Sequence, residues 1–202
     1  MNVNLEIRSG LTLHSPSGGR KYLNAAERKR FLIAAGNAEP EIRLFCLILL
    51  WTGARLSEAL ALTPAAIDLD NDAIALRTLK RRKTGLVREI PIPSALTRDI
   101  ERWFEIRRCQ QVAALAEARL WTWCRVTAWR KVKTVLAEAA IFGAANTPKG
   151  LRHSFGVAAF QSNIPSHLIQ RWLGHASLRT TAIYGQVIGR EEREFASRMW
   201  KM

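Results

Sequence analysis

The chain is short of cysteines, of acidic residues and of long apolar runs, and each shortage excludes a class of protein. Cys46, Cys109 and Cys124 lack the spacing of a metal or redox site, and such a sparse set predicts a reducing cytoplasm. The longest apolar run, 44–51, is far too short to cross a bilayer. The opening MNVNLEIRSG has no basic stretch followed by an apolar one, so we expect no signal peptide and no membrane partner.

The charge balance is strongly positive. Only 17 acidic residues accompany 31 lysines and arginines, which gives a formal net charge of +14 and a pI near 10.8. This excess indicates a polyanionic partner, of which nucleic acid is the commonest. A ribosomal-type protein, a membrane-surface binder and a merely basic soluble protein are the alternatives. With 48% hydrophobic residues among 202, the chain has enough apolar side chains for one folded domain with tails.

Three segments are expected along the chain. Residues 1–20 contain SPSGGRK and no clear periodicity, which predicts a flexible basic N-terminal arm. No linker or repeat divides the chain after residue 20, so one domain is expected over 21–187. The last segment, 188–202, holds a predicted amphipathic helix at 189–200. Its apolar face fits packing on its own domain or docking on a neighbouring protomer.

Helix caps and apolar periodicity predict a mainly helical domain. A capping box at Asn24 and Glu27 opens a helix that ends at Gly36, and Pro40 starts a second that ends at Thr52. Ser94 is the expected cap of a longer helix. The further helices are expected at 56–62, 94–111, 127–141, 148–161, 165–173 and 177–184.

Three short strands complete the fold class, which is mainly α with a small three-stranded antiparallel β-sheet. The alternating segments are 67–69, 73–79 and 86–92. Pro91 and Pro93 indicate a sheet edge or the end of the strand. The basic tip 80–85, KRRKTG, joins the last two strands. We interpret this run of cations as an anion contact, the alternative being a solvated turn.

The stretch from Lys149 to Tyr184 gathers residue types that suit attack on a phosphodiester. It contains Lys149-x-x-Arg152, then Leu-Gly-His175, then Tyr184 nine residues later. A guanidinium matches the two non-bridging phosphate oxygens, and a phenol becomes a covalent nucleophile once its charge is stabilised. The sequence has no acidic cluster resembling a two-metal site, so we expect neither a metal nor a cofactor.

Two cations earlier in the chain extend this set. Arg55 follows the Gly53 turn beneath an apolar helix, and this position holds it more firmly than a free surface would. Lys83 lies in the basic hairpin tip, from which a lysine can reach a leaving oxygen as general acid. Fixed cations around a pentacoordinate phosphate stabilise its extra charge without a metal.

Together these phrases resemble the catalytic domain of the tyrosine recombinases, the phage-integrase family. The matching segments are TGARLSE at 52–58, KTG at 83–85, LRHSF at 151–155, LGH at 173–175 and TAIY at 181–184. The resemblance covers about residues 22 to 187. It implies the tyrosine recombinase catalytic-domain fold and a site-specific recombinase or integrase that acts on double-stranded DNA. Further implications are a 3′-phosphotyrosine intermediate, independence of ATP and metal, and a homotetramer assembled on DNA. The resemblance further implies a bacterial protein that is cytoplasmic and nucleoid-associated and that acts on a mobile genetic element.

The resemblance also implies a role for each site residue. Tyr184 is the expected nucleophile, and Arg55 and Arg152 hold the non-bridging oxygens. Lys83 matches the hairpin lysine that protonates the leaving 5′ oxygen. His175 matches the second family histidine, which donates a hydrogen bond to the phosphate.

The remaining positions include one agreement and one departure. Glu58 matches an acidic residue that supports the first arginine. The residue three before Arg152 is generally histidine, and here it is Lys149, as in the small type IB topoisomerases. Lys149 can contact the phosphate, but a charged lysine is a poor base for Tyr184. We interpret His153, beside Arg152, as a buried structural histidine outside the site.

A second departure lies at the N-terminus. Most relatives carry a helical DNA-clamping domain there, whereas about 20 residues precede the domain in this chain. It resembles the stand-alone members, such as the bacterial fimbrial phase-variation recombinases, and an accessory DNA-binding protein could supply the missing grip. Two alternatives stay open: a topoisomerase-like enzyme that relaxes DNA without a specific site, and a DNA-binding regulator on the same fold.

Overall fold

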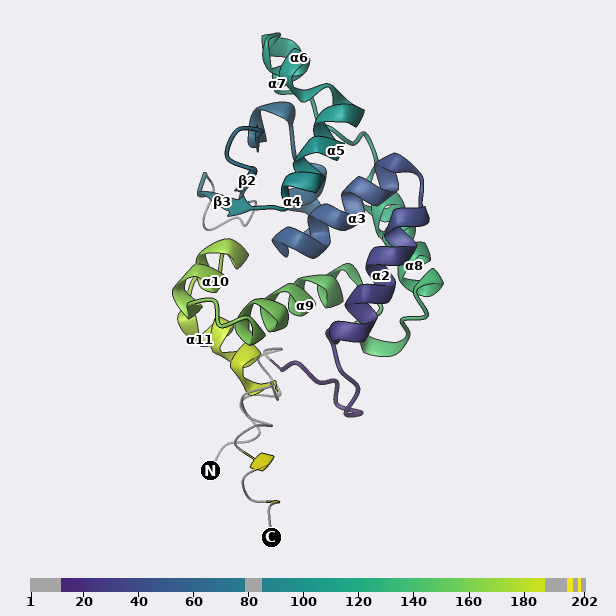
Figure 1. Cartoon of the computed structure of the whole chain (residues 1–202), viewed down its shortest axis with the longest axis vertical. Helices are drawn as coiled ribbons and strands as arrows, with labels where there is room; N and C mark the ends of the chain where they lie inside the picture. The colour runs from purple at the N-terminus through teal and green to yellow at the C-terminus, as the bar shows by residue number, and fades with distance from the viewer. Residues whose placement is uncertain (1–11, 79–84, 188–195, 198–199, 201–202) are drawn as a thin grey trace.

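The computed structural model describes residues 12–78, 85–187, 196, 197 and 200 of the chain. In these ranges the chain is mostly helical, with one small antiparallel sheet at the edge of the helical body (Figure 1). The predicted fold class is therefore confirmed. Within the same ranges, no helix has the length and apolar character needed to span a membrane.

The first helices follow the predicted caps. Helix α2, Ala25–Asn37, opens with the Asn24–Glu27 capping box. Helix α3, Pro40–Thr52, starts at its proline, and the chain leaves it through Gly53 at φ 61°, a left-handed conformation that suits glycine. Helix α4, Leu56–Leu60, ends two residues before the predicted boundary.

The sheet has the predicted antiparallel order. Strands β1 (Ile67–Asp68), β2 (Ala73–Arg77) and β3 (Val87–Pro91) pair in sequence, after a short 3-10 turn η1 at Pro64–Ala66. The register sets Ile67 opposite Ile74, and Leu76 opposite Arg88. Because β3 is an edge strand, it tolerates Pro91. Residues 79–84, which include Lys83, lie outside the described residues.

The single helix predicted at 94–111 is wrong, because the chain forms two helices there. Helix α5, Ser94–Phe104, and helix α6, Ile106–Gln110, are separated by Glu105 at φ 49°. Ser94 is also not the cap: Pro93 takes that position, and the Ser94 hydroxyl donates to Asp72 at 2.6 Å. A short helix α7, Ala113–Ala116, follows, in a stretch where no element was predicted.

The second half of the fold carries the stretch with the site motifs. Helix α8 spans Arg125–Glu138, α9 Pro148–Gln161, α10 Ser166–Leu173 and α11 Leu178–Ala182, with 3-10 turns η2 at Gly143–Ala145 and η3 at Ile183–Gln186. Helix α9 matches its predicted bounds, and Pro148 begins it after the Thr147 cap. The predicted helix 177–184 ends instead as the 3-10 turn that contains Tyr184.

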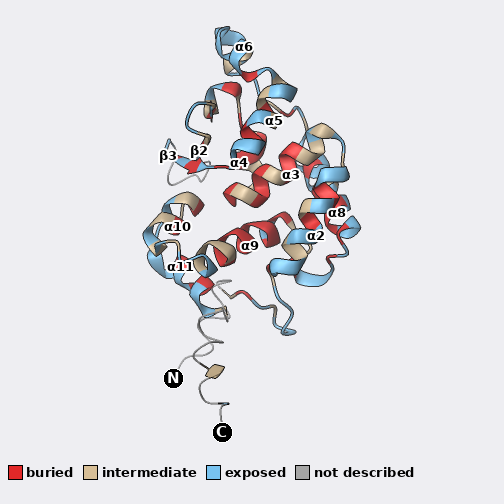
Figure 2. Ribbon diagram, in the orientation of Figure 1, coloured by how far each residue is buried: buried red, intermediate tan, exposed pale blue. Residues whose placement is uncertain are grey.

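The apolar interior forms two clusters of unequal size. The large cluster surrounds α3 and includes side chains from α2, α4, α5, α8 and the sheet. The small cluster joins α9 and α10 to η3, and its members are Leu13, Tyr22, Phe155, Val157, Ile169, Leu173, Ile183 and Tyr184. Figure 2 shows the buried residues concentrated along α3 and α9, which lie next to each other in the middle of the molecule.

Part of the expected N-terminal arm is described. Leu13 is buried in the small cluster, and the main chain of His14 pairs with that of Arg20. Arg20 forms an ion pair with Glu27 on α2 at 3.0 Å. Residues 16–20 are exposed, and the flexible arm over 1–20 stays a prediction. Residues 1–11 and most of the predicted helix 189–200 lie outside the described residues.

Candidate active site

Five of the six predicted site residues lie on described elements that meet where the two apolar clusters join. Arg55 immediately precedes α4, and Lys149 and Arg152 lie in the first turns of α9. His175 follows the turn that ends α10, and Tyr184 lies in η3. The sixth, Lys83, is outside the described residues.

Arg152 fixes the centre of the site. Its buried guanidinium donates from Nη1 to the carbonyl of Gly53 at 2.7 Å and from Nη2 to the carbonyl of Leu173. These carbonyls end α3 and α10, so one side chain ties two helix ends together. Burial, and then the positive charge of Arg55, lower the pKa of Arg152 to about 10, and it remains a cation at neutral pH.

Arg55 is held from one side and open on the other. The Glu58 carboxylate accepts from the Arg55 main-chain N–H at 2.9 Å and from its Nη1 at 2.7 Å. The Glu58 side chain is 1% exposed, whereas that of Arg55 is 37% exposed. A guanidinium anchored in this way keeps donors free for an anion. The structure therefore places Glu58 in the supporting position predicted for it.

His175 is neutral and fixed by two neighbours. Its Nδ1 lies 3.0 Å from Thr181 Oγ1, and its ring stacks on that of Tyr184 with centroids 6.2 Å apart. Burial, and then the charges of Arg152 and Arg55, lower the pKa of His175 to about 3. In the tautomer in which Nδ1 accepts from the Thr181 hydroxyl, Nε2 carries the proton and can donate it to a phosphate oxygen.

Tyr184 is buried against its neighbours, with 1% of the residue exposed. Its hydroxyl lies 3.2 Å from His153 Nδ1. A Cβ added at Gly156 would lie 2.6 Å from the Tyr184 ring, so the phenol packs directly on the α9 backbone. Burial raises the pKa of Tyr184, and the charges of Arg152 and Arg55 act in the opposite direction. Both arginines thus favour the phenolate.

His153 is the contact of Tyr184 that sequence analysis left outside the site. Its Nε2 is buried without a hydrogen-bond partner among the described residues. Burial, and then the charges of Lys149 and Arg152, lower the pKa of His153 to about 4. A buried histidine next to the motif arginine was visible in the sequence, but its contact with Tyr184, 31 positions away, was not.

Arg88 was not singled out either. This residue of β3 pairs with Glu58 at 2.6 Å, and its side chain is only 5% exposed. Burial pushes the pKa of Glu58 upward, but the hydrogen bond and charge of Arg88, together with Arg55, hold it below its ordinary value. The sequence did hold a signal for Arg88. Side chains of β3 alternate between outward and inward, and Arg88 takes the same inward face as Ile90, two residues later.

Lys149 is exposed at the start of α9. Its charge contributes to lowering the pKa of His153, which lies one helical turn further along α9. In the part of the chain that the structure describes, no group of three or more His, Cys, Asp and Glu residues is placed to hold a metal ion.

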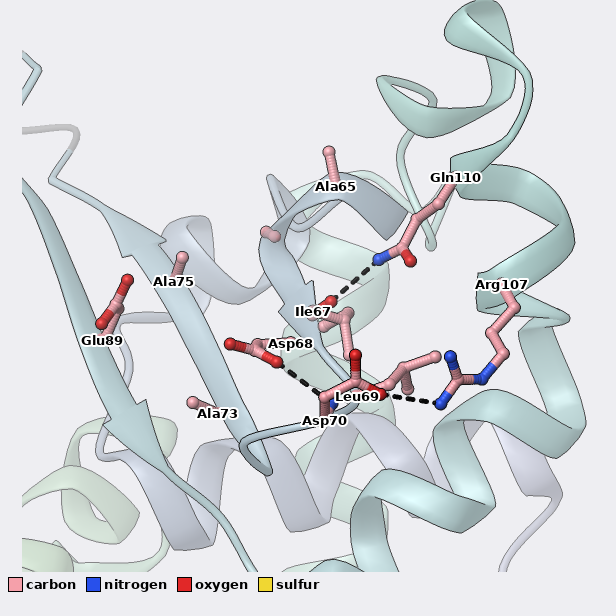
Figure 3. A pocket seen from close by; sticks show the side chains of 11 residues that line it. Ala65, Ile67, Asp68, Leu69, Asp70, Ala73, Ala75, Glu89, Arg107 and Gln110 are labelled. Carbon is pink, nitrogen blue, oxygen red and sulfur yellow. Dashed lines mark hydrogen bonds and ion pairs between the residues drawn. The ribbon is translucent and has the colours of Figure 1, made fainter.

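A hollow of about 350 Å³ lies elsewhere, between the sheet and α6 (Figure 3). Asp68, Asp70 and Glu89 give it acidic walls, and Arg107 reaches across to Asp70 at 2.9 Å. Gln110 donates to the carbonyl of Ile67 on its rim. None of the site residues lines it, and its acidic walls do not suit a phosphate.

Known proteins resemble this chain in sequence and in fold. Tyrosine recombinase XerA of Pyrococcus furiosus is 32% identical over 181 residues, which cover 88% of this chain and 61% of that protein. Tyrosine recombinase XerD of Mycobacterium tuberculosis is 34% identical over 151 residues, 71% of this chain and 47% of that protein. The chain thus spans less than two thirds of the length of these relatives.

Solved structures share the fold. A crystal structure of XerA recombinase superposes with a TM-score of 0.70 at 24% identity, covering 90% of this chain and 65% of that one. The XerH site-specific recombinase in a post-cleavage complex with palindromic difH substrate gives 0.74 at 23% identity, covering 96% and 58%. The catalytic domain of bacteriophage HP1 integrase gives 0.62 at 21% identity, covering 88% and 93%.

The sequence match is continuous over nearly the whole described body. Residues 21–189 match the Phage integrase family, and this range contains all six predicted site residues. The chain therefore belongs to the Phage integrase family, the tyrosine recombinases.

Proposed function

We propose that this protein is a site-specific DNA recombinase that cuts and rejoins double-stranded DNA through a 3′-phosphotyrosine at Tyr184. The observation that carries the proposal is the meeting of Arg152, Arg55 and Tyr184 from three separate elements, with both arginine charges acting on the phenol. Family membership supports the same chemistry.

The site residues that contact the phosphate have distinct parts in the proposed reaction. Arg55 and Arg152 bind the two non-bridging oxygens of the scissile phosphate. His175 donates from Nε2 to the same group, and Lys149 adds a further donor from the exposed side. The pentacoordinate transition state carries more negative charge than the diester, so fixed donors stabilise it preferentially. Loss of one such donor typically costs about 2.7–4 kcal/mol.

Proton transfer completes the proposed reaction. Tyr184 must lose its proton to attack phosphorus, and His153 Nδ1 is at hydrogen-bond distance from that proton. Burial is the largest cause of the low pKa of His153, and the charges of Lys149 and Arg152 lower it further. A bound phosphate would offset these two charges, which makes the imidazole a better base once DNA is present. Lys83 protonates the leaving 5′ oxygen. The 3′-phosphotyrosine conserves the diester energy, and the 5′ hydroxyl reverses the step on rejoining.

The assembly belongs to the proposal as well. Double-stranded DNA is the partner that the charge of +14 favours, and the XerH relatives are described in complexes with difH DNA. We place the protein as a homotetramer on DNA, with residues 188–202 docking on a neighbouring protomer. An accessory DNA-binding protein, a nucleoid location in the bacterial cytoplasm and a mobile-element role follow from the same proposal.

Covalent trapping tests the proposal. Protein is incubated without divalent metal on supercoiled DNA that carries the flanks of its own gene, then denatured in detergent and run on a gel. We expect a protein–DNA adduct with the wild type and none with Tyr184→Phe. A Tyr184→Phe variant that retains the adduct, or the full biological effect, contradicts the proposal. Binding without an adduct in both proteins would favour a DNA-binding regulator.

Lys149 supports a second candidate, a topoisomerase-like relaxation of DNA without a specific site. Lys149 lies three residues before Arg152, and a lysine at this position resembles the small type IB topoisomerases. Relaxation of plasmids that lack the gene flanks, at the rate seen with the flanks present, would favour this candidate. Adducts confined to one sequence would favour the recombinase.

A further inference from the structure

Arg88 occupies a position where the strand pattern calls for an apolar side chain. In β3 the inward residues are Arg88 and Ile90, and the register sets Arg88 opposite the buried Leu76. A charge buried in this way is costly unless it is fully paired. Arg88 is therefore present for its contacts rather than for packing.

Arg88 makes three hydrogen bonds, each to a different segment beside the site. Nη2 donates to Glu58 Oε2 at 2.6 Å, Nε donates to the carbonyl of Trp172 at 2.7 Å, and Nη1 donates to Thr78 Oγ1 at 3.2 Å. Glu58 holds Arg55. Trp172 lies three residues before His175, and Thr78 is the last described residue before the hairpin tip.

The turn before His175 rests on the same guanidinium. Gly174 has φ 63°, and a Cβ built there would lie 3.2 Å from Arg88 Cζ. Glycine thus meets two demands at once, a left-handed backbone and close approach to Arg88. The path of the main chain into His175 depends on where Arg88 lies.

The two oxygens of Glu58 are divided between two arginines. Oε1 accepts from the Arg55 side chain, whereas Oε2 accepts from Arg88 and from the Arg55 main-chain N–H. Without Arg88, Oε2 is released to turn to the guanidinium of Arg55 as well, in a bidentate pair that would occupy a further donor that the phosphate needs. With Arg88 present, the Arg55 guanidinium is held through Oε1 alone and keeps its other donors free.

We propose that Arg88 is a positioning residue for DNA cleavage, which sets Arg55 and His175 against the scissile phosphate by engaging Glu58 and the turn at Gly174. The inference rests on the proposed function. Arg88 acts through these residues and does not itself touch the DNA.

The test compares Arg88→Lys with Arg107→Lys, because Arg107 also pairs with a carboxylate but lies on the surface away from the site. Each purified protein is mixed with a DNA strand whose mapped cleavage position holds either a phosphodiester or a neutral methylphosphonate. On the diester, we expect adduct formation by Arg88→Lys to slow about 100-fold, the size typical of a misplaced catalytic group. The DNA dissociation constant of Arg88→Lys should stay within about threefold, because phosphate contacts elsewhere dominate affinity. Arg107→Lys should match the wild type.

The methylphosphonate separates positioning from folding. Because one non-bridging oxygen is replaced by a methyl group, the link carries no charge and needs less balancing from Arg55. The deficit of Arg88→Lys against the wild type should therefore shrink to below about tenfold, since less transition-state charge is left to stabilise. A deficit of equal size on both links overturns the inference, and so does an unchanged rate on the diester.

A milder variant covers the case in which Arg88→Lys does not fold. Thr78→Val removes one of the three hydrogen bonds while keeping the shape of the side chain. We expect its adduct rate on the diester to fall roughly threefold to tenfold, because Arg88 keeps two of its three hydrogen bonds, and this deficit should shrink on the methylphosphonate. An unaffected, folded Thr78→Val overturns the inference. Absence of any wild-type adduct overturns the proposed function together with the inference.

Discussion

The large and the small apolar clusters differ in what they contribute to the site. The large cluster is built from helix and strand side chains that are almost all apolar, and it carries Arg55 and Glu58 at its surface. The small cluster contains Tyr184 itself among its members, next to His175 and His153. One cluster supports the site from outside, whereas the other includes the nucleophile in its packing.

Two arginines connect the clusters. Arg152 joins the carbonyl that ends α3 to the carbonyl that ends α10, and Arg88 joins Glu58 to the carbonyl of Trp172. The reacting groups therefore come from both clusters, and their relative placement depends on these polar bridges. A change in the large cluster should alter stability, and one in the small cluster should alter activity as well.

The largest expected effect on stability comes from the large cluster. Leu49→Ala removes a fully buried side chain of α3 and leaves a cavity among apolar neighbours. We expect the free energy of unfolding to fall by about 2–5 kcal/mol, measured by urea denaturation. Adduct formation per folded molecule should stay within about twofold, because the distances between the site residues are unchanged. A specific loss of cleavage in folded Leu49→Ala would break the comparison.

Gly156→Ala tests the small cluster. The new Cβ would lie 2.6 Å from the Tyr184 ring, so the ring must move away from the α9 backbone. We expect a stability loss of about 1–3 kcal/mol from overpacking and a cleavage rate lower by about 100-fold from displacement of the nucleophile. Gly36→Ala is the matched control, because its Cβ would meet nothing within 4 Å in helix α2. Normal cleavage by Gly156→Ala would contradict the difference between the clusters.

A smaller effect is expected from pH. The pKa values of His153 and His175 are lowered to about 4 and about 3, chiefly by burial, while the unfolded chain has ordinary histidines. Below pH 6.5 the unfolded state therefore binds protons that the folded state does not, and stability is lost as the pH falls towards the folded values. Between pH 7 and pH 5 we expect a total loss of roughly 2–3 kcal/mol, after allowing for the partial exposure of His175.

Histidine substitution isolates the pH effect. The stability lost between pH 7 and pH 5 should be smaller in His153→Asn, because asparagine cannot take up a proton. It should be unchanged in His14→Asn, because His14 is exposed and lies outside the site. Thermal melting at each pH measures it. An identical pH profile in His153→Asn and the wild type would show that burial of the small-cluster histidines does not set this dependence.

Much of the fold was predictable because local signals and tertiary structure agree. The Asn24 capping box, Pro40, Gly53 and Pro148 each mark a boundary that the structure keeps. The helix break at Glu105 carried no such signal, since no glycine or proline stands there. Long helical periodicity on both sides hid a left-handed residue whose conformation is set by packing.

The site was predictable as a set of motifs but not as a network. The residues Arg55, Arg152, His175 and Tyr184 stand in family phrases, and the structure brings them to the junction of the clusters. The contacts that orient them are long-range, such as the bonds from Arg88 to residues 30 and 84 positions away. No single sequence fixes such pairs, although the inward charge on β3 indicates that Arg88 needs partners.

Main-chain oxygens hold Arg152, and this has a consequence for how the family can diverge. The carbonyls of Gly53 and Leu173 persist whatever side chains stand at those positions. Substitution around the anchor cannot delete its acceptors and can only move them. The hydrogen bonds of Arg152 therefore constrain the shape of the backbone, at the turn through Gly53 and at Leu173. This turn is tightly packed, since a Cβ at residue 53 would meet Leu173 and Phe155 within 3 Å. Relatives can lose most of their sequence identity and still hold this arginine in the same way.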